Sequence, residues 1–412
     1  MLQRWPQVVR YVVSCACIGG LLAAPLDAQP RDASAASPSV FTLVGARVVK
    51  ADGELYDGLA VVVDNGRIQR IELASTTGLP TPVELPAGSV LCPGFIELCS
   101  NLGAKNQNFE LASPIDAEAS ALDASDPSSA HFAKALAAGV TAALVWPAPI
   151  NLVSGRAFVA RTHVTRDEFD CLRVDGPLVF SLGNQVLRMD REPTSRGRAL
   201  ALLTESLRTG GQQSPTFRDY LAGRVPALFV AGDVVDVESA LTLFGGGLSM
   251  PVLVADLDVR ATTERLRLGR ELAARKAVAI LGPFTFATPE NKVRIAGEWD
   301  RAGVRVALAG GWPAATPTSL RQSASLAVRE GLSLAAARRA LTVHAAVAGG
   351  VSHRIGAIGS GLDADLVVWS GDPLRLESEV LEVYSRGIRV VHRAALRTPQ
   401  RAATAKKDID EL

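Results

Sequence analysis

Short stretches of alternating apolar and polar residues open and close the structured part of the chain. They are residues 41–50, 59–73, 364–371 and 380–393. A period of two is typical of half-buried strands. Asn65-Gly66 and Arg386-Gly387 predict hairpin turns within two of these stretches. We therefore expect one small β-sandwich domain built from both chain ends, residues 41–88 and 355–395.

Between these ends, short aliphatic runs alternate with amphipathic helical stretches such as 128–139 and 262–276. The candidate strands are 89–98, 139–146, 156–164, 177–182, 226–232, 251–256, 277–282 and 303–310. Eight strands alternating with helices over about 250 residues predict an α/β fold, a (β/α)8 TIM-like barrel at 89–354. A doubly wound open sheet is the alternative, but no glycine-rich phosphate motif follows the first strand.

The two extreme ends of the chain have a different pattern. Arg4 and Arg10 precede an apolar run at 11–22, and small residues follow at 23–28. This order predicts a signal peptide at 1–28 and an exported protein, periplasmic or secreted. The run is shorter than the roughly 20 apolar residues that span a bilayer, although an N-terminal anchor is the alternative. Residues 29–40 predict a disordered lead-in, and 396–412 a polar tail.

The composition is that of a globular protein, with 48% hydrophobic and 21% charged residues. Two of the 43 basic and one of the 42 acidic residues lie within 1–28, so the mature chain keeps 41 of each. A neutral chain without a basic stripe is a poor candidate for binding nucleic acid or, once the signal is removed, a membrane. Cys92, Cys99 and Cys171 remain, an odd number, so at least one is free or paired between chains.

Three motifs resemble the amidohydrolase superfamily. LCPGFIELCSNLG (91–103) is similar to a segment that in the family reads Pro-Gly-Phe-Ile-Asp-Ala-His-Ser-His-Leu-Gly, and RIGAIGSGLDADLVVWSGDPL (354–374) to the family's closing motif. AKALAAGVTAALVWP (133–147) with NLVSG (151–155) resembles the imidazolonepropionase-like branch. The likeness extends over about 41–393. It implies a metal-dependent hydrolase of amide or cyclic amide C–N bonds, with two metals, usually zinc, at the carboxyl mouth of the barrel.

The resemblance also implies which positions should hold those metals, and here the chain departs from the family. The paired histidines of strand 1 fall on Cys99 and Asn101, and the bridging lysine of strand 4 on Val179. The histidines of strands 5 and 6 fall near Val230 and Ala255, and the aspartate of strand 8 on Gly310 or Gly311. One thiol does not make a zinc site, which needs about three protein ligands. We expect no metal and no other cofactor.

The histidines do not replace the missing ligands. His131, His163, His344, His353 and His392 form no His-x-His or His-Glu-x-x-His motif, and only His163, at the end of a candidate strand, is a candidate for the mouth. Cys99 is a candidate nucleophile if a base and a positive environment lower its pKa. The plainer interpretation is a half-buried cysteine in place of a lost ligand.

A cluster of arginines follows the fourth candidate strand. Arg188, Arg191 and Arg196, with Arg198 nearby, are candidates to bind a carboxylate at the mouth. The alternative is that they are solvated charges paired with Asp190 and Glu192.

Three functions remain open from the sequence. The first, which we favour, is a catalytically degenerate amidohydrolase homologue that acts as a partner, in a hetero-oligomer with an intact paralogue. The second is an active C–N hydrolase with a non-standard site such as Cys99. The third is a protein that binds a small-molecule ligand at the empty mouth.

Overall fold

The computed structural model describes residues 40–393, apart from 105–108, 246–250 and 255–261. Apart from Val40, the expected signal segment, lead-in and polar tail lie outside the described residues. Within them, no helix is both long enough and apolar enough to cross a membrane.

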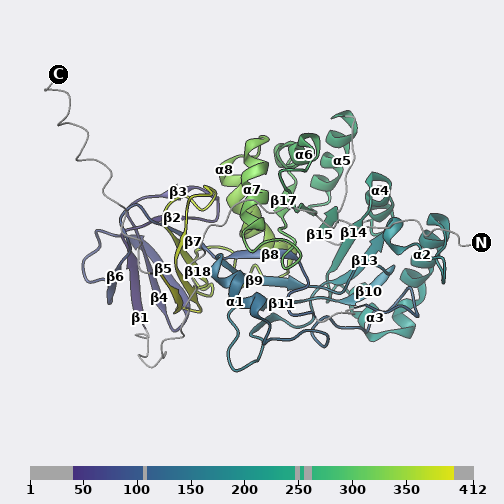
Figure 1. Ribbon diagram of the computed structural model, residues 1–412, viewed down its shortest axis with the longest axis horizontal. Helices are drawn as coiled ribbons and strands as arrows, with labels where there is room; N and C mark the ends of the chain where they lie inside the picture. Colours follow the sequence, from purple (N-terminus) through teal and green to yellow (C-terminus); the bar gives the residue numbers. More distant parts are fainter. Residues whose placement is uncertain (1–39, 105–108, 246–250, 255–261, 394–412) are drawn as a thin grey trace, which may run out of the picture. The chain divides into compact units, whose positions relative to one another are not determined.

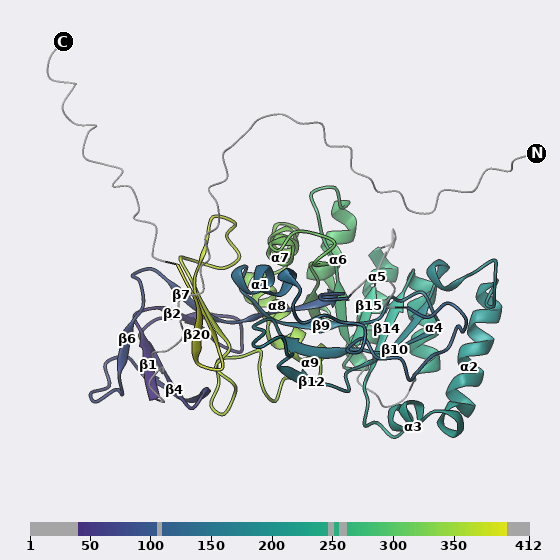
Figure 2. The same ribbon diagram turned by 60° about the horizontal axis from the view of Figure 1, so that its bottom comes forward.

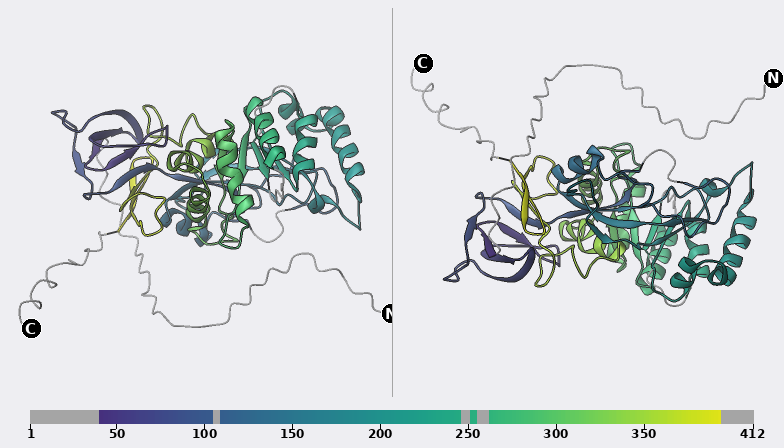
Figure 3. Two further views of the ribbon diagram at one scale, coloured as in Figure 1. Left: turned by 90° about the horizontal axis from the view of Figure 1, so that it is seen from above. Right: turned by 90° about the horizontal axis from the view of Figure 1, so that it is seen from below.

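Strands from both ends of the described chain form one six-stranded sheet. Its strands are β2 (Arg47–Val49), β3 (Leu55–Tyr56), β7 (Val90–Pro93), β18 (Leu366–Trp369), β19 (Val380–Ser385) and β20 (Ile388–His392). Their order is β20-β19-β18-β7-β2-β3, and β18 pairs antiparallel with β7. The purple N-terminal and yellow C-terminal strands therefore lie side by side (Figure 1), as Figure 2 and both views of Figure 3 also show.

A second sheet has the order β5-β4-β1-β6. Its strands are β1 (Val40–Val44), β4 (Leu59–Asp64), β5 (Arg67–Leu73) and β6 (Pro82–Glu84). Side chains of both sheets, among them Val61 and Leu366, share one buried cluster. The hairpin turns are confirmed: Asn65-Gly66 joins β4 to β5 and Arg386-Gly387 joins β19 to β20, all with positive φ.

The middle of the chain forms two further sheets. One has the order β12-β11-β9-β8, with β8 (Phe95–Ser100), β9 (Val140–Val145), β11 (Phe158–Arg161) and β12 (Cys171–Arg173). The other runs β10-β13-β14-β15-β16-β17, with β10 (Val153–Arg156), β13 (Leu178–Leu182), β14 (Ala227–Ala231), β15 (Pro251–Val254), β16 (Val278–Leu281) and β17 (Arg305–Leu308). β13 to β17 are parallel to one another, as β8 is to β9.

The candidate strand at 156–164 differs from the prediction of a parallel barrel strand. It is two consecutive strands, β10 and β11, each antiparallel to its partner: β10 pairs with β13 and β11 with β9. Only residues 146–152 connect β9 to β10, whereas a parallel crossover needs about a dozen residues. The chain therefore returns in the opposite direction. The candidate strand at 89–98 is likewise two strands, β7 and β8, which belong to different sheets on either side of Gly94. A Cβ at Gly94 would lie 1.9 Å from Thr141 Oγ1.

Buried side chains from both of these sheets meet in one cluster. It includes Leu98 of β8, Leu144 of β9, Val179 of β13 and Ile280 of β16. Alternate residues face the other way, since Phe180 of β13 contacts Phe217 and Phe244 among the helices. Among the described residues, no ladder joins β8 to β17, so the sheets are not closed by hydrogen bonds. The fold is mixed α/β, and the expected closure is not established.

The described helices all lie between β8 and β18 in the sequence, and capping side chains mark the start of several of them. They are α1 (Ala130–Ala137), α2 (Arg196–Gln213), α3 (Pro215–Leu221), α4 (Val234–Leu243), α5 (Thr262–Ala274), α6 (Glu290–Arg301), α7 (Ser319–Arg329), α8 (Leu334–Leu341) and α9 (Val343–Ala348). Ser129 and Ser195 cap α1 and α2, and Asp233 forms a capping box with Asp236 on α4. α9 contributes Ala345 and Ala346 to the cluster that the two middle sheets share.

Candidate functional site

The carboxyl end of β8 carries Cys99 and Asn101, the positions of the family's paired histidines. Cys99 is partly buried and packs against the shared cluster, while Asn101 is exposed. Burial, followed by the charge of Glu97, raises the pKa of the Cys99 thiol to about 12. A thiol that stays protonated at neutral pH is a poor nucleophile.

Glu97, two residues before Cys99, is a buried acid that our sequence reading missed. It is 1% exposed, and Oε1 accepts hydrogen bonds from Cys99 N at 2.9 Å and Gly310 N at 3.0 Å. Oε2 lies 3.1 Å from the same Gly310 N. Burial raises the pKa of Glu97 to about 7, although these backbone N–H groups favour the charged form. The signal was available, because Glu97 is the only charged residue in the apolar segment 89–100.

Gly310 and Gly311 follow β17, where the family has an aspartate. A Cβ on Gly310 would lie 2.6 Å from Glu97 Oε2 and 2.6 Å from Leu320 N. Real Cβ atoms do not approach other atoms so closely, so no side chain fits at Gly310 while Glu97 is in place. Gly311 has φ +72°, a conformation that disfavours a side chain.

The positions on β13 and β14 are enclosed in the apolar interior. Val179 is fully buried and Val230 is 2% exposed, and both belong to the shared cluster. A lysine or an imidazole there would replace packed methyl groups and bring a charge or a polar ring among aliphatic side chains. Ala255 lies outside the described residues.

The three candidate arginines contact three different sets of atoms. Arg188 pairs with Asp190 at 3.2 Å. Arg196 contacts Asp233 at 2.8 Å and Asp236 at 3.3 Å. The structure therefore does not bring the three guanidinium groups together around one site.

Arg191 differs because it contacts no carboxylate among the described residues. Nη2 donates to Asn151 Oδ1 and Nη1 to the carbonyl of Glu192 at 2.9 Å, whereas the buried Nε has no partner. Burial and the neighbouring Arg188 lower its pKa. Arg198, by contrast, pairs with Glu192 at 2.8 Å.

His163, His344 and His392 lie apart from the strand ends described above, whereas the ring of His131 packs edge-on against Trp312, next to Gly311, with centroids 5.4 Å apart. His163 follows β11, whose Arg161 pairs with Ala142 near the start of β9. Because β11 is antiparallel, His163 is at the opposite end of the sheet from Cys99, so it is not a candidate for the mouth. His344 Nδ1 lies 2.8 Å from the carbonyl of Val306, and His392 Nδ1 lies 3.0 Å from Glu382.

Comparisons with known proteins agree on one family. Residues 273–391 match the amidohydrolase family. An imidazolonepropionase from Sphingopyxis alaskensis is 36% identical over 163 residues, which cover 37% of this chain and 36% of that protein. The crystal structure of an amidohydrolase from Thermotoga maritima MSB8 covers 86% of this chain and 100% of its own, with a TM-score of 0.74 and 24% identity. Together, these matches support the amidohydrolase superfamily as the family of this chain.

The likeness to these known proteins is partial and distant. The match spans about a third of the length of the imidazolonepropionase. A molinate hydrolase structure covers 85% of this chain and 94% of its own at 13% identity, with a TM-score of 0.54, and shows the fold alone.

The metal site that the amidohydrolase superfamily implies does not fit the residues present. In the described part of the chain, no three His, Cys, Asp or Glu side chains come together as ligands of one ion would. A catalytic zinc site needs about three such ligands. At the strand ends the donors are one thiol with a raised pKa and one carboxylate already bound to backbone N–H groups. We therefore derive no catalytic step through a metal.

Proposed function

We propose that the chain is an exported, catalytically degenerate amidohydrolase homologue that acts by binding, as the partner of an intact amidohydrolase chain in the same compartment. Family membership alone would favour hydrolysis of C–N bonds. The state of three ligand positions favours degeneracy, because Val179, Val230 and Gly310 are enclosed by other groups rather than merely substituted.

One observation carries this proposal. The Glu97 carboxylate occupies the space beside Gly310 where the family's aspartate would begin. Its contact to Gly310 N links β8 to the end of β17, while its contact to Cys99 N lies within β8. Restoring an aspartate at Gly310 would therefore displace a buried group that the fold uses.

We propose further that the middle sheets are a modified form of the (β/α)8 barrel. The order β8-β9-β11 continues through Ala157 into β10-β13-β14-β15-β16-β17, with one antiparallel member. The shared apolar cluster would be the interior, and Glu97 would bridge the gap between β17 and β8 in place of a ladder. The two sheets built from the chain ends would then be the separate small domain, 41–88 and 355–395.

The alternative of a cysteine hydrolase receives little support. A nucleophilic cysteine needs a nearby base or cation to lower its pKa. Cys99 instead faces the buried Glu97, and its pKa is raised.

Exposed apolar side chains on the loops that follow the strands support a role in binding. Met189 after β13 is 98% exposed, and Phe286 after β16 is 72% exposed. Phe109 and Leu111, in the long segment after β8, are 38% and 48% exposed. Large apolar side chains exposed near a former active site are more consistent with a protein contact than with catalysis.

Metal content and activity test the degeneracy. The purified mature protein is expected to hold no stoichiometric zinc, and chelators should leave its melting temperature unchanged. Cys99→His with Asn101→His should give no amidase activity, because Val179 and Gly310 remain. One or two zinc ions per chain, lost together with stability on chelation, would contradict the proposal.

Affinity capture tests the partner. Tagged mature protein from its native host should recover an amidohydrolase paralogue in near-equal amounts. Met189→Glu with Phe286→Glu should reduce that recovery at least tenfold. Leu73→Glu is the matched control, because Leu73 is 63% exposed on β5, away from these loops. Equal recovery with both variants would assign the contact to another surface.

A further inference from the structure

Two adjoining hollows lie at one end of the sheets built from the chain ends. The chain crosses from one sheet to the other there three times, between β1 and β2, between β3 and β4, and between β6 and β7. The larger hollow has a volume of about 460 Å³ and the smaller about 290 Å³. Gly45 and Ala74 line both, so the two hollows adjoin.

Glycines keep these hollows open. Gly58 and Gly88 line the smaller one with φ of +69° and +77°, and Gly78 lines the larger one with φ +79°. A Cβ at any of the three would meet no atom within 4 Å. The turns need glycine for their backbone conformation, and as a result no side chain fills the space.

The smaller hollow contains polar groups without partners. Ser89 is 1% exposed, yet its Oγ has no hydrogen-bond partner. Buried hydroxyl groups are normally hydrogen-bonded, so an unpartnered one points to a missing partner.

Arg47 and Asp57 also line the smaller hollow. The register of β2 and β3, with Val48 opposite Tyr56, places them directly opposite each other just beyond the paired residues. Neither side chain forms a hydrogen bond or an ion pair with the described residues. Oppositely charged side chains at such facing positions commonly form an ion pair. Arg47 and Asp57 do not form one, so the charge of each is available to a ligand.

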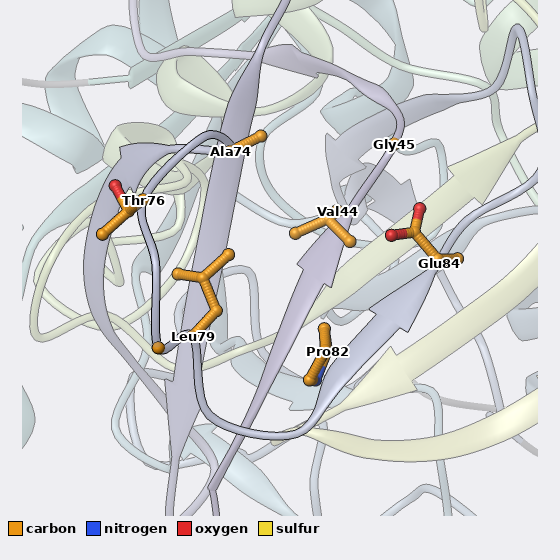
Figure 4. A pocket seen from close by; sticks show the side chains of 8 residues that line it. Val44, Gly45, Ala74, Thr76, Leu79, Pro82 and Glu84 are labelled. Atoms are coloured by element: carbon orange, nitrogen blue, oxygen red, sulfur yellow. The ribbon is translucent and has the colours of Figure 1, made fainter.

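The larger hollow combines an apolar wall with one charge. Figure 4 shows Val44, Leu79 and Pro82 around it, together with the carboxylate of Glu84. Glu84 is exposed and has no ion-pair partner among the described residues. The combined lining thus offers one cation, two carboxylates and a hydroxyl beside aliphatic surface.

We propose that these hollows bind a small zwitterion that carries a second cation, the chemistry of a free basic amino acid. Its carboxylate complements Arg47, its α-ammonium group Asp57 and its terminal cation Glu84, while its methylene chain covers the apolar wall. The size agrees, since small-ligand sites begin at about 300 Å³. This site is separate from the ends of β8 and β17, so it does not depend on the proposed function.

Isothermal titration calorimetry of the mature protein with L-lysine and L-arginine tests the proposal. We expect saturable binding, at least tenfold weaker for norleucine, which lacks the terminal cation, and for cadaverine, which lacks the carboxylate. Arg47→Gln and Glu84→Gln should each weaken lysine binding at least tenfold.

Matched controls are available on β5. Arg70 and Glu72 form an exposed ion pair at 3.0 Å outside the hollows, so Arg70→Gln and Glu72→Gln should bind like the parent protein. Circular dichroism establishes that each variant is folded. No heat with any of the four compounds, or equal affinity in the folded Arg47→Gln and Glu84→Gln variants, would overturn the proposal.

Discussion

Two buried charges in this molecule are held in opposite ways. Arg161 on β11 is fully buried, and its guanidinium contacts Asp365 at 2.9 Å, Asp170 at 3.0 Å and Asp363 at 2.6 Å. Glu97 on β8 is equally buried but forms no ion pair with any described residue, and only backbone N–H groups donate to it. The charge of Arg161 is neutralised by carboxylate side chains, whereas the charge of Glu97 is stabilised only by the dipoles of backbone N–H groups.

The difference is visible in the pKa of each group. Burial lowers the pKa of Arg161, but the charges of Asp365 and Asp170 outweigh it and raise the pKa. For Glu97, burial outweighs the N–H groups and raises the pKa to about 7. Arg161 therefore stays charged at every physiological pH, while Glu97 titrates within the physiological range.

The largest effect is expected on removing the guanidinium. Arg161→Met leaves Asp365 and Asp363 buried with reduced compensation, which typically costs about 3–5 kcal/mol of unfolding free energy. Urea denaturation at pH 7 measures the loss. Arg354→Met is the control, because Arg354 contacts only Asp363 at 2.8 Å and is itself partly exposed, so it should cost far less. Equal losses of unfolding free energy in the two variants would contradict the larger contribution expected of the buried Arg161.

A pH titration of stability should isolate Glu97. Its pKa in the folded protein, about 7, is above the ordinary value of 4.5. Its contribution is therefore complete below pH 4.5 and is lost as pH rises through 7, by an amount on the order of 3 kcal/mol. Unfolding free energies measured from pH 4.5 to 8 in the parent and in Glu97→Gln give this loss as a difference. Parallel curves for the two proteins would contradict the buried, unpaired carboxylate.

Deleting the Glu97 side chain is expected to lower the unfolding free energy by less than the two effects above. Glu97→Ala leaves the N–H groups of Cys99 and Gly310 without their acceptor, at about 1–3 kcal/mol for each one that stays buried and unpaired. The charge-desolvation cost disappears at the same time, so the net loss at pH 8 should be smaller than at pH 5. Urea denaturation of Glu97→Ala at both pH values checks this. Glu72→Ala, at a partly exposed position on β5, should show no such dependence.

The contrast between these two groups also shows what the sequence could predict. β13 to β17 could be identified because each is a short run of mostly apolar residues, a pattern that needs no knowledge of neighbouring strands. The predicted direction of β10 and β11 was wrong, because the alternation of apolar and polar side chains does not show which way a strand runs. Only the length of the connection 146–152, too short for a parallel crossover, indicates the direction.

The site was harder to predict for a related reason. The family's motifs locate Cys99, Asn101 and Gly310, but they show only which metal ligands are missing. The contact between Glu97 and Gly310 spans 213 residues, and no local pattern announces it. Nor could spacing show that Arg196 contacts Asp233 and Asp236 while Arg191 contacts neutral groups.

The smallest effect concerns Cys99, which lies next to Glu97. Burial is the larger cause of its raised pKa and the Glu97 charge the smaller one. Thiolate is the reactive form, and a pKa raised from 9.0 to about 12 lowers its fraction at pH 8 about a thousandfold relative to the unfolded chain. Iodoacetamide should therefore alkylate Cys99 very slowly in the folded protein. Glu97→Gln should accelerate that reaction only slightly, because burial remains.

Mass spectrometry of the Cys99 peptide over time measures both rates, with guanidine-unfolded protein as the reference. Rapid alkylation of the folded parent would show that Cys99 is ionised, and would return the cysteine-hydrolase alternative to consideration.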